Sequence, residues 1–242
     1  KGINIEEIID NREEVDSRLV YEVEKNNIKI FKGFTVTDTG GYKRIKRISI
    51  MQLSKDGQKV IGTKINLSCD CLGVSGGWTP AVHLFTQSGG KLRFRDEDQT
   101  FIPDSYPSDQ LSIGACNGDL NLDEILNNVP EILKNFLNIK DTEYANLEVL
   151  SSTNKSKRNI WLLPSDKIFG KTKSFVDFQN DATAKDIKLA LREGFRSIEH
   201  VKRYTTTGMG TDQGKLGNMH ALGIISETAD AKMGKLGTTT FR

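Results

Sequence analysis

The most constraining feature of the sequence is a T-x-x-D capping box in the last third of the chain. The side chains of Thr183 and Asp186 can each accept a backbone N–H at the start of a helix. Gly194 can then end that helix, because glycine readily adopts the left-handed conformation. Ser197 is placed to cap a second helix and Asp212 a third. The spacing predicts a small all-α domain.

The third of these helices is predicted to carry Leu216 and Met219 on its apolar side. The loop that precedes it, residues 205–215, is rich in hydroxyl groups and N–H donors, and Lys202 and Arg203 lie just before it. Such a composition can bind a phosphate. The alternative, that these residues only cap helices, fits the common role of Thr and Asp equally well.

The N-terminal part predicts a β-α-β unit. An apolar run over residues 3–10 ends at Asp10, a polar helix is expected over residues 12–25, and a strand follows at residues 28–31. An acid that closes the first strand is where a Rossmann domain usually holds a ribose. The glycine fingerprint would lie upstream of Lys1, so an ordinary acid at the end of a strand is the alternative.

Residues 35–70 alternate apolar and polar side chains with a period of two, and glycine-bearing turns interrupt them. This pattern predicts an antiparallel meander. Cys69 and Cys71 would point to the same face of an extended segment. Since no second pair completes a tetrahedral metal site, we expect buried thiols.

A short apolar strand at residues 111–115 runs through a glycine turn into a helix expected at residues 123–136. The free N–H groups and the positive dipole end of such a helix attract an anion. A structural turn that binds no ligand is the alternative. No nucleophile–base pair or metal-ligand set is visible in the chain, so the sequence predicts no catalytic residue.

Charge and composition exclude some classes of function. The 34 Lys and Arg residues against 32 Asp and Glu residues give a net charge of +2, which is too small to indicate nucleic-acid binding. No long apolar run predicts a membrane span. The three cysteines suit a reducing cytoplasm. The chain begins at Lys1 without a methionine, as expected of a piece of a longer protein.

Several phrases together resemble one family. They are VDFQND, AKDI, REGFRS and KRYTTTGM-x-TDQGK, with LGVSGGWTPAVHLFTQSGGKLRF before them and GTTTFR after them. Because long unrelated phrases agree in order, the chain resembles the alpha subunits of heterotetrameric sarcosine oxidases almost from end to end.

The predicted helical domain is also similar to the [2Fe–2S] domain of bacterioferritin-associated ferredoxin. The four cluster cysteines of that domain correspond here to Asp177, Gln179, Asp212 and Gly217. A cluster needs soft thiolate ligands, which none of these residues supplies. We therefore expect the scaffold without an iron–sulfur cluster and without any metal.

The resemblance implies a fold class and a domain order. The fold is expected to be α/β, a partial two-dinucleotide-binding-domain fold with an antiparallel meander, followed by a small all-α domain. Residues 1–148 would be the C-terminal portion of the NAD/FAD-type region, residues 149–172 a linker, and residues 173–242 the helical domain lacking cluster cysteines.

The resemblance also implies cofactors and partners. NAD would be bound by this subunit, FMN at the interface with the beta subunit, FAD in the beta subunit, and tetrahydrofolate in a later domain. The partners would be the beta, gamma and delta subunits, in the cytoplasm, with no nucleic acid and no membrane. The residues expected to line NAD are Gly114, Ala115, Asp119, Leu120 and Asn121, and those expected near FMN are Thr206, Thr211, Gln213 and Lys215.

The implied activity is the oxidative demethylation of sarcosine to glycine, with formation of peroxide and methylene-tetrahydrofolate. The segment itself would contribute NAD binding and a subunit interface and would not be catalytic alone. Two alternatives remain open from the residues, a stand-alone NAD(P)H-dependent flavin reductase and a non-enzymatic docking module.

Overall fold

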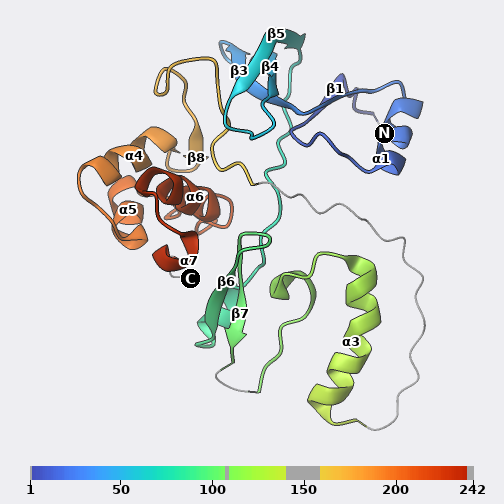
Figure 1. Cartoon of the computed structure of the whole chain (residues 1–242), viewed down its shortest axis with the longest axis vertical. Coiled ribbons are helices and arrows are strands. Elements are labelled where there is room, and N and C mark those ends of the chain that lie inside the picture. The colour runs from blue at the N-terminus through green and yellow to red at the C-terminus, as the bar shows by residue number, and fades with distance from the viewer. Residues whose placement is uncertain (1, 107–108, 140–158, 239–242) are drawn as a thin grey trace. The chain divides into compact units, whose positions relative to one another are not determined.

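The computed structural model describes residues 2–106, 109–139 and 159–238 (Figure 1). Its residues form two compact units. The first contains the described residues within Lys1–Gly76, Asn154–Phe175 and Thr183–Asp186. The second contains those within Gly77–Thr153, Val176–Ala182 and Ile187–Arg242.

The first unit opens with the predicted β-α-β motif. Strand β1 (Glu7–Asp10) is followed by helix α1 (Ser17–Lys25) and by strand β2 (Lys29–Lys32), which pairs with β1 in parallel. Asp16 caps α1, because its carboxylate accepts the N–H of Arg18 at 2.9 Å. The helix therefore begins later than the sequence pattern predicted.

The predicted meander is confirmed as a three-stranded antiparallel sheet. It consists of β3 (Phe34–Gly41), β4 (Ile45–Leu53) and β5 (Val60–Ser68), in that order. Phe31, Ile48 and Ile50 form its buried cluster, and Ile50 is fully buried. The alternating pattern was readable in the sequence because one face of the sheet packs on this cluster.

The expectation of buried thiols at Cys69 and Cys71 is wrong. Cys69 is only partly buried and Cys71 is exposed. The physical reason is that β5 ends at Ser68, so both residues follow the last strand pair and lie in irregular chain.

The second unit contains a hairpin and a long helix. Helix α2 (His83–Gln87) precedes strands β6 (Lys91–Arg95) and β7 (Thr100–Ser105), which pair antiparallel. A 3-10 turn, η1 (Gly114–Asn117), then leads into α3 (Leu122–Leu137), within one residue of the predicted bounds. Ile125 of α3 lies behind Gly114, since a Cβ on that glycine would be 3.5 Å from its Cγ2.

The C-terminal region is helical, as predicted (Figure 1). After the short strands β8 (Phe175–Asp177) and β9 (Ala182–Thr183) come α4 (Ala184–Arg192), α5 (Ile198–Thr205), α6 (Asn218–Ala229) and α7 (Met233–Leu236). Its most deeply buried side chains include Ile187, Val201 and Ile225. Helix α6 is buried on most sides, which is why its sequence lacks a clear polar face.

The predicted N-terminal cap of α4 is confirmed, whereas the predicted N-terminal cap of α6 is wrong. The N–H of Thr183 donates to the Asp186 carboxylate at 2.8 Å, and the N–H of Asp186 lies 3.4 Å from the Thr183 hydroxyl, so the capping box is confirmed. Asp212 does not cap α6, because that helix begins only after Gly217. Leu216 consequently lies outside the helix and is 73% exposed, contrary to prediction.

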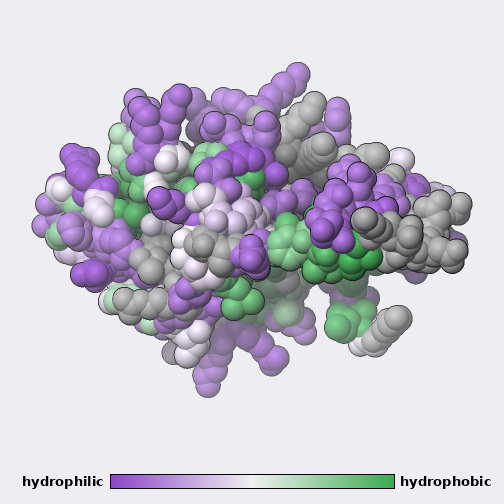
Figure 2. Space-filling model, turned by 90° about the horizontal axis from the view of Figure 1, so that it is seen from below, coloured by the Kyte–Doolittle hydropathy of each residue, from purple (hydrophilic) through white to green (hydrophobic). Residues whose placement is uncertain are grey.

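On the face shown in Figure 2, hydrophilic side chains predominate and hydrophobic ones form small groups, in keeping with a chain in which 27% of residues are charged. Within the described residues, no helix has both the length and the apolar character needed to cross a bilayer.

Candidate functional site

The carboxylate of Asp177 joins two loops of the helical region. Its Oδ1 accepts the N–H groups of Gln179 and Asn180 at 2.8 and 2.9 Å. Its Oδ2 accepts the N–H of Gly208 at 2.7 Å. The side chain is buried, at 6% exposure. Burial acts to raise the pKa of Asp177, but the hydrogen bonds from Asn180, Gly208 and Gln179 outweigh it and hold that pKa below its ordinary value.

Gln179 makes a second connection between the same loops. Its Oε1 accepts the backbone N–H of Thr211 at 2.5 Å and the hydroxyl of Thr211 at 2.8 Å. A Cβ on Gly210 would lie 2.3 Å from this oxygen, so glycine at position 210 allows the amide to approach the loop.

The other two positions that were expected to correspond to cluster cysteines also take part in local structure. Asp212 accepts the N–H groups of Gly214 and Leu216, at 3.4 and 3.2 Å, and so closes the turn before α6. A Cβ on Gly217 would lie 2.5 Å from the carbonyl oxygen of Val176. Because a real Cβ does not approach a backbone oxygen so closely, position 217 has no space for a side chain.

These residues do not fit an iron–sulfur cluster. The four positions supply two carboxylates, an amide and a glycine, and none of these is the thiolate that a cluster requires. Asp177 and Gln179 direct their oxygens to backbone N–H groups of the neighbouring loop. The loops that would surround a cluster are thus tied together by side chains.

The residues predicted near FMN lie along one loop, and their polar groups are partly committed to that loop. Thr206 adopts the left-handed conformation at the end of α5, with φ of 60°. Thr211 is bound to Gln179, and the side-chain amide of Gln213 donates to the carbonyl of Gly210 at 2.8 Å. The N–H of Thr211, which could have bound a phosphate, is already satisfied by Gln179.

Lys215, the fourth of these residues, lies near His83 of α2. Lys215 and His83 line a small cavity of about 30 Å³, together with Asn218 and Met219. Burial lowers the pKa of His83, and the positive charge of Lys215 lowers it further. Lys215 is exposed, and its ammonium is the one formal charge among the four predicted residues.

The residues predicted to line NAD lie in η1 and in the turn that leads from η1 into α3. Gly114 has a φ of 73° and is buried, whereas Ala115, Asp119 and Leu120 are exposed. Asn121 occupies the N-cap position of α3, but its amide donates to Glu124 at 2.9 Å. The five residues are therefore close in space, with exposed groups beside a helix N-terminus.

Arg95 of β6 fixes this turn against the hairpin. Its guanidinium donates to the carbonyl of Gly118 at 2.7 Å and is paired with Asp98. A Cβ on Gly118 would lie 2.7 Å from both the guanidinium and Ile102, and its φ of 84° also favours glycine. The close approach of Arg95 places a cation near the carboxylate of Asp119.

Sequence reasoning missed Asp123 in the first turn of α3. Its Oδ1 is buried and has no hydrogen-bond partner within the described part of the chain. A buried acceptor of this kind suits a sugar hydroxyl, for which Ala115 offers no side-chain group. The first turn also carries Glu124, so two carboxylates would repel a phosphate at this position. The turn fits a ribose better than a pyrophosphate.

The carboxylate of Asp10 is hydrogen-bonded within its own loop. It accepts the Arg12 N–H and Nε at 2.9 Å and Nη2 at 2.7 Å. The alternative of an ordinary acid at the end of a strand explains this geometry without a ligand.

Comparisons with known proteins agree with the resemblance noted in the sequence. Residues 171–242 match the sarcosine oxidase A3 domain. The sarcosine oxidase subunit alpha of Rhizobium meliloti (strain 1021) is 34% identical over 217 residues, covering 85% of this chain and 22% of that protein. The subunit alpha of Corynebacterium sp. (strain P-1) is 30% identical, covering 97% of this chain and 25% of that protein.

The fold is also similar to a solved structure, that of L-proline dehydrogenase from P. horikoshii. The TM-score is 0.56 at 17% identity, over 98% of this chain and 47% of that one. This likeness supports the mixed α/β fold class. The chain spans about a quarter of the length of the curated relatives it matches. Taken with the ordered phrases and the A3 match, these findings show that the chain belongs to the family of sarcosine oxidase alpha subunits, as a segment of such a subunit.

Proposed function

We propose that this chain is the part of an alpha subunit that binds the nucleoside portion of NAD and docks against a flavin-bearing partner in a sarcosine-oxidising complex. The observation that carries the proposal is the similarity to sarcosine oxidase alpha subunits over 97% of the chain. The whole complex would oxidatively demethylate sarcosine to glycine in the cytoplasm, with beta, gamma and delta subunits as partners.

The cofactors of the proposed complex divide the chemistry. Bound FAD and FMN would supply electron transfer from sarcosine to oxygen, and tetrahydrofolate would accept the one-carbon unit elsewhere in the complex. The residues of this segment would bind cofactors and hold them in position. None of them is assigned a catalytic role.

For NAD, we assign η1 and the turn that leads from it into α3. Gly114 and Ala115 would approach the nucleotide by backbone, and Asp119, Leu120 and Asn121 would border it. Asp123 would accept a ribose hydroxyl, because its buried Oδ1 has no hydrogen-bond partner within the described residues. Asp123→Asn should therefore lower the NAD content of the purified protein, whereas Glu131→Gln on the exposed side of the same helix should not.

For FMN, we assign the loop of residues 205–215 as part of its surroundings. Lys215 would bind an anionic group of the flavin, while Thr206, Thr211 and Gln213 border the loop surface. Two exposed apolar side chains support a docking role, because a protein partner would cover them: Met209 of this loop, at 51% exposure, and Phe178 of the loop after β8, at 74%.

The test is co-expression of the full-length protein with its partner subunits, followed by measurement of sarcosine-dependent peroxide formation and of flavin absorbance. Lys215→Gln should reduce the FMN content of the assembled complex, and Lys134→Gln on α3 should leave it unchanged. NAD(P)H oxidation by the protein without any partner would instead favour a stand-alone flavin reductase. Assembly without sarcosine-dependent peroxide would favour a docking module.

A further inference from the structure

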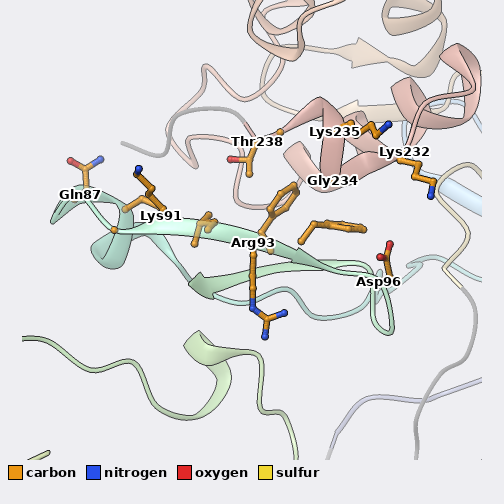
Figure 3. A pocket seen from close by; sticks show the side chains of 14 residues that line it. Gln87, Lys91, Arg93, Asp96, Lys232, Gly234, Lys235 and Thr238 are labelled. Carbon is orange, nitrogen blue, oxygen red and sulfur yellow. The ribbon is translucent and has the colours of Figure 1, made fainter. Parts of the chain in front are cut away.

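An open groove of about 880 Å³ lies in the second unit between the β6–β7 hairpin and α7 (Figure 3). We call it the basic groove and define it by Lys91, Phe94, Phe101, Lys232, Gly234 and Lys235. It is made by segments far apart in the sequence, and none of its residues belongs to the turn assigned to NAD or to the loop assigned to FMN.

The floor of the basic groove is aromatic. Phe94 and Phe101 pack edge to face with ring centroids 5.1 Å apart. Phe101 is 5% exposed, whereas Phe94 is only partly buried and so borders the groove. A Cβ on Gly234 would lie 3.1 Å from the Cβ of Phe94, so glycine lets α7 come close to the ring. The groove can therefore cover one side of a flat apolar group.

The rim of the basic groove is positively charged. Lys91 comes from β6, and Lys232 and Lys235 come from α7 and the residue before it (Figure 3). All three lysines are exposed, and no ion pair holds their ammonium groups within the described residues. Asp96 is the carboxylate among the lining residues.

Arg93 contributes little to this charge. Its side chain points away from α7 (Figure 3), and its Nε lies 3.6 Å from the carboxylate of Asp104. Strand alternation explains the arrangement, because Arg93 and Phe94 lie on opposite faces of β6. The aromatic floor and the three lysines therefore border the groove, while the guanidinium of Arg93 is turned toward Asp104.

We propose that the basic groove binds a small molecule with a flat aromatic ring that carries a phosphate group. The ring would lie against Phe94, and the phosphate would be bound by Lys232 and Lys235. Lys91 lies at the other end of the groove (Figure 3). This site goes beyond the proposed NAD and FMN contacts and does not depend on them.

The test is calorimetric titration of the purified protein with 1-naphthyl phosphate, which has the ring and the phosphate but is not a nucleotide. We expect saturable binding that weakens as salt is raised, since the lysines are exposed. Neither 1-naphthol nor inorganic phosphate, each of which lacks one half of the ligand, should bind as tightly. Equal binding of inorganic phosphate would overturn the role of the aromatic floor.

Two variants locate the binding. Lys232→Gln with Lys235→Gln should weaken 1-naphthyl phosphate at least tenfold, and Phe94→Leu should weaken it severalfold while keeping the lysines. Lys134→Gln, an exposed lysine of the same unit outside the groove, is the matched control. No saturable binding, or equal binding by the double variant and the control, would show that the lysines are only solvated and would overturn the proposal.

Discussion

At the scale of single residues, Asp177 is the most consequential side chain described here. One carboxylate satisfies backbone donors on two loops, and its bond to Gly208 spans 31 residues of sequence. The sequence marks this position only through the resemblance to the ferredoxin domain, in which a cluster cysteine is expected to correspond to it. The bond itself depends on the approach of two loops, which no local pattern encodes.

Replacing Asp177 by Asn should destabilise the protein by about 1–3 kcal/mol. The amide oxygen can still accept from Gln179 and Asn180, but the amide nitrogen would then face the N–H of Gly208, donor against donor. Urea unfolding measures the change. Asp181→Asn, in an exposed position of the same loop with a φ of 53° that Asn tolerates, should change stability by less than about 0.5 kcal/mol. Equal unfolding midpoints for the two variants would contradict the assignment.

The same carboxylate predicts a pH dependence. In the unfolded chain, the pKa of an aspartate is about 3.9. In the folded protein, the pKa of Asp177 lies below its ordinary value. The contribution of Asp177 to stability is therefore fully present above about pH 5 and is lost as the pH falls through the folded pKa. Asp177→Asn should lose less unfolding free energy than the parent between pH 7 and pH 3. A larger loss in the variant would reverse the sign and refute the account.

At the scale of elements, the start of α6 differs from the prediction for a physical reason. Asp212 has the side chain of a cap, but it serves the turn before the helix, through the N–H groups of Gly214 and Leu216. The helix begins after Gly217, where the chain passes close to the carbonyl of Val176. The spacing of apolar and polar residues does not reveal such a close approach of two backbones. Only the glycine at position 217 indicates it.

Gly217→Ala should destabilise the protein by about 1–3 kcal/mol, because its Cβ would lie 2.5 Å from a backbone oxygen and the chain must shift. Gly73→Ala is the matched control, since a Cβ at position 73 meets nothing within 4 Å. Thermal unfolding of both variants compares them directly. A melting temperature for Gly217→Ala as high as that of Gly73→Ala would mean that the approach to Val176 is looser than described.

At the scale of the whole molecule, the described part of the predicted linker is bound to the meander sheet of the first unit. Lys64 pairs with Asp166 and Lys167 with Asp38, both at 2.6 Å. The hydroxyl of Ser165 also donates to the carbonyl of Thr37, at 3.3 Å. Residues 149–158 of that predicted linker lie outside the described residues, so the domain bounds stay a prediction.

Lys64→Gln with Lys167→Gln should make residues 159–172 more susceptible to proteolysis, because both ion pairs to the sheet are lost. Lys55→Gln with Lys59→Gln removes the same charge from the turn between β4 and β5 and should leave the cleavage rate of this segment unchanged. Mass spectrometry of the first cleavage products measures both. Protection that persists in the first double variant would indicate that these ion pairs do not hold the segment.

Much of the architecture was predictable because it follows from the spacing of apolar and polar residues along short stretches of sequence. The β-α-β unit, the meander and the capping box all depend on residues close together in sequence. The basic groove and the tie at Asp177 were not predictable, because they join residues such as Lys91 with Lys235 and Asp177 with Gly208. The burial of Asp123 Oδ1 likewise depends on how the turn folds against α3.

The tie between the Asp177 and Gly208 loops has a consequence for how the protein matures. A connection made of a carboxylate and backbone amides forms as soon as the chain folds, so it needs no delivery of iron or sulfide. It also contains no thiolate that an oxidant could attack. A domain built this way can fold in cells short of iron as well as in cells that have it, and it would stay intact beside the peroxide-releasing chemistry that we propose for the complex.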